Sequence, residues 1–216
     1  MFRFSSRIAP LLSCATAVLL LTAGPALAGP PLLCHPFDIG SAKSLPWDGS
    51  NSWYHGQAGY DLQNLIGDTE ALLTPSTPVI VRMETLRRAA LYASQDERIA
   101  TQLLARLTER ANKAGDPLPL FDAGYLAETF RQIGYLGQMP EFRTRAQAMK
   151  ALADSAEGFA LVRRSISLRP DDAGLQFAAA LAIADRDRSA YQQHAAKARK
   201  GAAQDALLAR NLSHIS

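Results

Sequence analysis

The chain has 216 residues, of which 48% are hydrophobic, and its 23 basic and 20 acidic residues give a formal net charge of +3. No basic stripe is interleaved with aromatic residues, so composition and charge argue against nucleic acid as a partner. The length is sufficient for one domain with a substantial core.

Residues 1–28 have the pattern of a secretory signal peptide. Arg3 and Arg7 give a basic start, residues 15–21 form an apolar run, and residues 26–28 form a small-x-small peptidase site, with cleavage expected directly after it. The apolar run is too short for an uncleaved membrane anchor. The many arginines and alanines are typical of a GC-rich bacterial genome. We therefore expect the processed chain to be periplasmic or secreted, with no membrane association.

Residues 29–60 differ in composition from the rest of the chain, and we call this segment the arm. It is rich in proline and turn-forming residues and carries both tryptophans. A disordered linker would not carry so many aromatic residues. The pattern predicts an extended arm that is held against the helices by Phe37, Ile39, Trp47 and Trp53, because such side chains bury a large apolar area.

The arm also holds residues that could carry chemistry. Cys34 is the one cysteine left after signal removal, so it is expected to be buried, or else to link two chains in a disulfide-bonded homodimer. As an alternative, Cys34 could act as a nucleophile with His55 as its base, since the adjacent His35 would point to the opposite face of an extended chain. A metal site could use Cys34, His35, His55 and Asp48, with Asp38 as a further carboxylate, although no CxxC or HExxH spacing supports one.

The clearest helical pattern runs from Thr77 to Lys113. Thr77 and Pro78 suit a helix start, and apolar residues then recur at steps of three and four. Residues 94–97 have the S-x-x-E form of a capping box, which would open a second helix, and Gly115 suits the end of that helix. A connection this short predicts antiparallel neighbours with facing apolar stripes.

Helical periodicity extends over most of the remaining chain. The predicted ranges are 62–73, 117–133, 159–168, 172–184, 191–198 and 203–212. Asp61 is placed to cap the first of these helices. Phe121 and Tyr125 belong to the apolar side of the second. Residues 141–154 have a weaker pattern, which fits either a short helix or an ordered loop.

Residues 165–200 resemble a tetratricopeptide-like repeat. The resemblance lies in residues 168–171 at the end of one helix, an alanine-rich helix over 172–184, a polar turn, and then Tyr191 and Ala195. In that family, helix pairs stack into a curved array whose concave side binds peptides or proteins. The match covers about one repeat and lacks the family's large residue early in the first helix. The resemblance therefore implies helix-pair architecture more than it implies peptide binding.

Together the patterns predict one all-α domain over residues 61–216, preceded by the arm. Its antiparallel helix hairpins would stack as an α-solenoid or as an irregular bundle, in an oligomeric state that is left open. The chain has no Gly-rich phosphate loop and no nucleophile elbow. This favours a non-enzymatic scaffold without cofactor that binds a protein or peptide, over a thiol- or metal-dependent enzyme. The residues expected to contact the partner are Trp47, Trp53, Tyr54, Phe121 and Tyr125.

Overall fold

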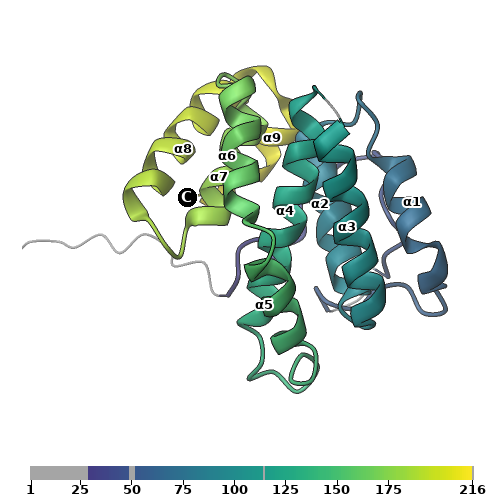
Figure 1. Ribbon diagram of the computed structural model, residues 1–216. Helices are drawn as coiled ribbons and strands as arrows, with labels where there is room; N and C mark the ends of the chain where they lie inside the picture. Colours follow the sequence, from purple (N-terminus) through teal and green to yellow (C-terminus); the bar gives the residue numbers. More distant parts are fainter. Residues whose placement is uncertain (1–28, 49–51, 114, 216) are drawn as a thin grey trace, which may run out of the picture.

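The computed structural model describes residues 29–48, 52–113 and 115–215, and every secondary-structure element assigned within these ranges is a helix (Figure 1). The α-helices are α1 (Leu65–Leu72), α2 (Val79–Ala93), α3 (Glu97–Lys113), α4 (Pro117–Gly134), α5 (Ala146–Asp154), α6 (Gly158–Leu168), α7 (Ala173–Ile183), α8 (Arg188–Gly201) and α9 (Ala206–Asn211). Short 3-10 helices cover Leu62–Asn64, Ala202–Gln204 and Leu212–Ile215. The described arm contains one isolated β-bridge, between Trp47 and Gly56. The prediction of an all-α fold is confirmed.

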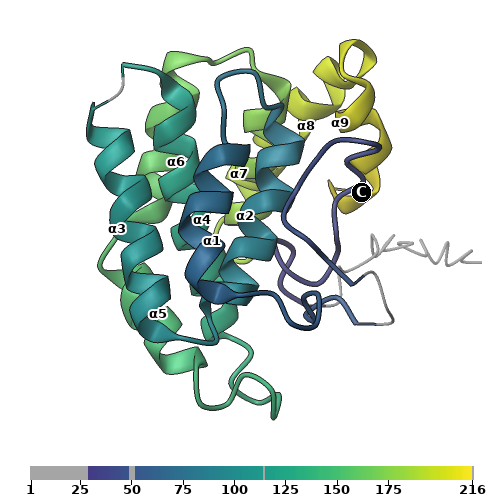
Figure 2. The ribbon, with the colours of Figure 1, turned by 90° about the vertical axis from the view of Figure 1, so that its right-hand side faces the viewer.

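Helix α4 lies in the middle of the stack (Figure 1). It packs against α2 and α3, which precede it in the chain, and against α5 and α6, which follow it. Helix α7 packs extensively along α8. The described helices thus pack pairwise against their neighbours, which is compatible with a helical-repeat arrangement. Figure 2 shows the arm, in purple and dark blue, lying between α2 and the yellow C-terminal helices.

The backbones of α4 and α6 come into direct contact where they cross. A Cβ atom built on Gly124 would lie 2.6 Å from the carbonyl oxygen of Gly158, and one built on Gly158 would lie 2.8 Å from the Cβ of Ala127. Real Cβ atoms do not approach other heavy atoms this closely, so both positions require glycine. This crossing fixes α6 against the central helix.

Helix α2 is buried on all sides. Every residue of it except Arg88 is buried, including Arg82, Glu84 and Arg87. The repeating apolar positions predict the face that contacts other helices, whereas the polar face is covered by the arm and by α4. A helix buried on all sides is expected only when its polar side chains are paired inside the protein.

Two helix boundaries differ from the sequence-based prediction. Helix α2 begins at Val79 with Pro78 at the N-cap position, while the Thr77 hydroxyl donates to a carbonyl of the preceding helix. The capping box predicted at residues 94–97 is wrong: Ser94 is the C-cap of α2, and the carboxylate of Asp96 accepts from the first amides of α3. Asp96 is two residues closer to the helix and has the stronger acceptor, so its carboxylate replaces the Ser94 hydroxyl.

Other expectations for the helices are confirmed. Asp61 caps the first helical turn by accepting from the Gln63 amide, and residues 146–154 of the ambiguous segment form α5. Helix α7 has 11 residues and is buried almost throughout, yet it is far too short to cross a bilayer. Among the described residues, none of the helices combines the length and the apolar character of a membrane span.

Candidate functional site

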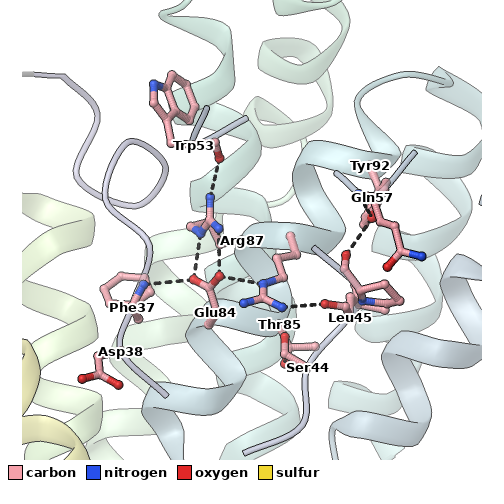
Figure 3. Close-up of polar contacts among 12 residues, drawn as sticks. Phe37, Asp38, Ser44, Leu45, Trp53, Gln57, Glu84, Thr85, Arg87 and Tyr92 are labelled. Carbon is pink, nitrogen blue, oxygen red and sulfur yellow. Dashed lines mark hydrogen bonds and ion pairs between the residues drawn. The ribbon is translucent and has the colours of Figure 1, made fainter. Parts of the chain in front are cut away.

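A buried carboxylate on α2, that of Glu84, accepts a hydrogen bond from the backbone of the arm. Both oxygens of Glu84 are bonded: Oε2 accepts from the Phe37 amide at 3.1 Å and from Arg87 Nε at 2.8 Å. Oε1 accepts from Arg87 Nη2 at 2.8 Å and from Arg88 Nε at 2.7 Å (Figure 3). Burial acts to raise the pKa of Glu84, but the hydrogen bonds and charges of Arg87 and Arg88 outweigh it and hold that pKa below its usual value.

The two arginines beside Glu84 extend this network to the arm backbone. Arg87 Nη1 donates to the carbonyl of Trp53 at 2.8 Å and to that of Leu33 at 3.3 Å. Arg88 Nη1 donates to the Leu45 carbonyl at 2.6 Å. Side chains of α2 thus satisfy arm carbonyls that would otherwise need a β-ladder or water. We call Glu84, Arg87 and Arg88 the α2 polar cluster.

Tyr92 holds the second half of the arm. Its hydroxyl donates to the Pro46 carbonyl at 2.7 Å and accepts from the Gln57 amide at 2.8 Å (Figure 3). The ring of Trp47 packs edge-on against the Tyr92 ring, with centroids 5.5 Å apart. One tyrosine therefore fastens two points of the arm that are eleven positions apart in the sequence.

The aromatic and aliphatic residues of the arm pack as predicted. Phe37 and Ile39 are buried, and Trp47 and Trp53 are half-buried against the core. The Trp53 ring stacks on Phe142 with centroids 5.8 Å apart and planes 6° from parallel. The prediction that these four residues hold the arm to the helices is confirmed.

An open cleft of about 620 Å³ lies where the end of the arm meets the helices, and we call it the arm cleft. Three segments that are distant in the sequence supply its walls: the arm, the end of α2 and the turn that precedes α5. The lining residues are Tyr54, His55, Gly56, Gln57, Ala58, Gly59, Tyr60, Leu62, Tyr92, Ser94, Gln95, Glu141, Thr144 and Arg145.

The tyrosine hydroxyls of the arm cleft already have protein partners. Tyr54 donates to Glu141 Oε1 at 3.3 Å, and Tyr60 donates to Asp68 Oδ2 at 2.7 Å. Burial raises the pKa of Tyr60, as does its hydrogen bond to Asp68. The rings of Tyr60 and Tyr92 lie 4.6 Å apart. The cleft therefore presents ring surface rather than free hydroxyls.

The residues of the alternative metal site do not converge. Within the three described ranges, no three His, Cys, Asp or Glu side chains are grouped so that they could hold a metal ion. His35 packs edge-on against the ring of His214, at 6.0 Å, whereas His55 packs against Tyr54 in the arm cleft. Cys34 does not line that cleft, and the side chains of Asp38 and Asp48 are exposed.

Cys34 does not have the environment of a nucleophile. Its side chain is half-buried beside Gly29, and burial raises the pKa of the thiol to about 11, against a smaller lowering by Arg87. A nucleophilic cysteine needs a substantial thiolate population near neutral pH. In the described part of the chain, His55 lines the arm cleft and Cys34 does not, and the pKa of the Cys34 thiol is raised, so the geometry does not favour the Cys34–His55 alternative.

Alkylation of Cys34 by iodoacetamide at pH 7.5 is expected to be about a hundredfold slower than alkylation of free cysteine, because the rise in pKa from 9.0 to about 11 lowers the thiolate fraction by that factor. Mass spectrometry of timed samples measures the rate. The same reaction in 8 M urea is the control and should return to the free-cysteine rate. A native rate equal to that of free cysteine would contradict the described burial.

The predicted partner-contacting residues fall into two groups. Phe121 and Tyr125 are completely buried in α4, so their role is core packing, and no surface on the folded protein presents them. Burial follows from the central position of α4, which the periodicity alone does not reveal. Tyr54 lines the arm cleft, and Trp47 and Trp53 lie in the arm with part of each side chain accessible.

Sequence analysis missed the α2 polar cluster and the cleft residues Tyr92 and Arg145. One signal was present for the cluster: Val79, Ile80 and Val81 are consecutive apolar residues, so α2 has apolar side chains on every face. A helix of that kind is buried throughout, and its charged residues must then be paired. No comparable signal marks Arg145, which reaches the cleft only through the turn before α5.

Comparisons with protein-family models, with curated proteins and with solved structures return no match for this chain.

Proposed function

We propose that this protein is an exported bacterial scaffold that binds a peptide or an extended segment of another protein in the arm cleft. The observation that carries the proposal is the cleft itself, a cavity of about 620 Å³ whose lining combines tyrosine residues with polar side chains. Ligand sites are concave, and placed polar groups in them fix the orientation of the ligand. Export follows from the signal-like pattern of residues 1–28, which lie outside the described part of the chain.

The cleft walls are fixed before any ligand arrives. Tyr54 is bonded to Glu141, Gln57 is bonded to Tyr92, and Tyr60 is bonded to Asp68, so both ends of the cleft-lining part of the arm are attached to the helices or to the turn before α5. A pre-organised site loses less conformational entropy when it binds. The arrangement supports recognition of a flexible segment by a rigid groove.

The proposal includes a tetratricopeptide-like character for the C-terminal helices. It is supported by the close packing of α7 on α8 and by the residues 165–200 that resemble such a repeat. In this view α6, α7 and α8 form the supporting stack. The arm supplies a binding surface that helix pairs alone would not have.

A photo-crosslinking amino acid, p-benzoylphenylalanine, at Gln95 is expected to form adducts with a discrete partner in intact bacteria, and these adducts should be recovered from the periplasmic fraction. Gln95 is exposed and lines the cleft. The matched control is the same substitution at exposed Gln192 on α8, outside the cleft. A tryptophan at Thr144 should fill the cleft and suppress the Gln95 adducts.

Two results would contradict the proposed function. One is the same set of adducts from positions 95 and 192, which indicates random collisions rather than a site. The other is adduct formation at Gln95 that persists at full yield in the Thr144→Trp background. Retention of the circular dichroism spectrum and unfolding midpoint by each variant verifies that the fold is intact.

A further inference from the structure

We propose that the arm cleft binds its peptide through a carboxylate, and that Arg145 receives this carboxylate. The inference rests on the proposed function and names the chemistry of its ligand. It begins from one observation, a half-buried guanidinium on the cleft wall that forms no ion pair among the described residues.

The guanidinium of Arg145 is held in place by two neighbours. Its Nη1 donates to the Ser94 hydroxyl at 3.2 Å, and its Cζ lies 4.3 Å from the centre of the Phe142 ring. The Ser94 hydroxyl is itself fixed, because it donates to the Leu91 carbonyl at 2.8 Å. Stacking on a ring and a single hydrogen bond orient an arginine without neutralising it.

The charge of Arg145 is only weakly compensated. Burial lowers the pKa of its guanidinium, with Glu141 opposing that change, and its Nε is shielded from solvent with no hydrogen-bond partner in the described chain. By contrast, the buried guanidinium of Arg87 donates twice to Glu84. Likewise Arg131, which is also largely buried, is paired with two acidic residues.

A partly desolvated cation that forms no ion pair binds an anion more strongly than an exposed one does. The rest of the cleft decides which anion fits. The partly exposed rings of Tyr54 and Tyr60 offer apolar surface, because their hydroxyls donate to Glu141 and Asp68. Such surface suits the side chains of a peptide better than it suits a small hydrated ion.

Glu141 further restricts which ligands fit the arm cleft. Its carboxylate lies in the same cleft as Arg145 and accepts from the Tyr54 hydroxyl through Oε1, which leaves its other oxygen to accept an N–H group of a bound peptide. Inorganic phosphate carries no N–H group for Glu141, whereas a peptide does. A peptide that carries one carboxylate, either at its C-terminus or on an Asp or Glu side chain, complements both residues.

Three pools of immobilised random hexapeptides test this inference and distinguish the two sources of carboxylate. The first has free C-terminal carboxylates and no acidic residues, the second has C-terminal carboxamides and no acidic residues, and the third adds a central Glu to the second. The purified protein should bind best to the first or the third pool. For the best sequences, Kd should be at least about tenfold lower than for the matched carboxamide or Gln peptides.

Two variants assign the preference to Arg145. Arg145→Gln should bind carboxylate and neutral peptides equally, whereas Arg143→Gln should keep the full preference, because Arg143 is exposed and does not line the cleft. If Arg145→Gln fails to fold, Arg145→Lys replaces it. This variant keeps the charge but loses the two-pronged geometry, so a reduced preference is expected.

The outcomes separate this inference from the proposed function. Equal binding of carboxylate and neutral peptides that Thr144→Trp still abolishes would overturn the role of Arg145 and leave peptide binding in the cleft intact. An unchanged preference in Arg145→Gln would have the same meaning. Absence of binding in all pools, or binding that ignores Thr144→Trp, would overturn both proposals.

Discussion

Glu84→Ala is expected to lower the free energy of unfolding by about 3–5 kcal/mol, because it leaves a buried charge without its partner. The side chain of Arg87 is completely buried and donates twice to Glu84. The substitution also removes the acceptor of the Phe37 amide, which is the attachment point at the start of the arm. Urea unfolding at pH 7.5, followed by circular dichroism at 222 nm, measures the loss.

The Glu84 carboxylate also makes the free energy of unfolding depend on pH. Because the pKa of Glu84 is lower in the folded protein than in the unfolded chain, its contribution is present above the ordinary value of 4.5. The contribution is lost as pH falls through the lowered pKa, since the folded state must then bind a proton that weakens its bonds to Arg87 and Arg88. Stability of the wild-type protein should therefore decline below pH 4.5, and Glu84→Ala should lack this component.

Two further variants control for the Glu84 prediction. Glu84→Leu combined with Arg87→Met removes both charges and should recover part of the loss, because Arg87 is then no longer a buried charge without its partner. The recovery is incomplete, since the Phe37 amide, the Trp53 carbonyl and Arg88 still lose their partners. Arg98→Met removes an exposed ion pair and should change the free energy of unfolding by less than about 1 kcal/mol. A loss below about 1 kcal/mol for Glu84→Ala would mean that the α2 polar cluster does not anchor the arm.

Arg82→Met is expected to lower the free energy of unfolding by about 3–5 kcal/mol at pH 7.5, with a clearly smaller loss at pH 4.5. Arg82 Nη1 lies 2.6 Å from Asp122 Oδ2, and both side chains are buried between α2 and α4. Arg82 also donates to the carbonyls of Thr77 and Thr74, which fixes the loop before α2.

The pH dependence follows from Asp122. Burial raises its pKa to about 6, against the lowering effect of Arg82. A carboxyl with a raised folded pKa costs stability as pH rises from its unfolded pKa, 3.8, to its folded pKa. Removing Arg82 raises the folded pKa further and extends that decline to higher pH. At pH 4.5 the folded state holds protonated Asp122 with or without Arg82, so the charge-related part of the loss disappears.

Urea unfolding at both pH values checks the Arg82 prediction. Arg82→Met combined with Asp122→Leu is the control, and its free energy of unfolding should lack the decline between pH 4.5 and pH 7.5 that Asp122 causes in the wild type, because no titrating carboxyl remains at the site. An equal loss for Arg82→Met alone at the two pH values would show that Asp122 is not the group responsible.

The periodicity of apolar residues was sufficient to predict the helices, but it did not predict how deeply each helix is buried in the core. The spacing of apolar residues identifies α2 and α3, and it predicts that they are joined by a short turn. It does not show that Arg82, Glu84 and Arg87 lie inside. The burial of Glu84 and Arg87 depends on the irregular arm folded across them, and that of Arg82 depends on α4. Charged residues on a helix face are usually solvated, and only tertiary contacts reverse that expectation.

The candidate site was less predictable than the fold. Aromatic residues in the arm indicated a packed segment, and Tyr54 does line the cleft. Arg145 and Tyr92 come from other parts of the chain, and the turn that carries Arg145 has no sequence pattern that places it beside the arm. Phe121 and Tyr125 were predicted to contact a partner but are buried in the core. An aromatic side chain on a helix suits a core and a binding surface equally well, so its residue type does not decide between them.

The link between the arm and α9 has a consequence for folding. The Asp38 amide donates to Asn211 Oδ1 and the Asp38 carbonyl accepts from Asn211 Nδ2, both at 2.9 Å, across 173 positions of the chain. The arm leaves the ribosome early, yet its contact with α9 forms only when nearly all of the described chain has been made. Contacts of such long range slow folding, so the joining of the arm to α9 is a late step in folding.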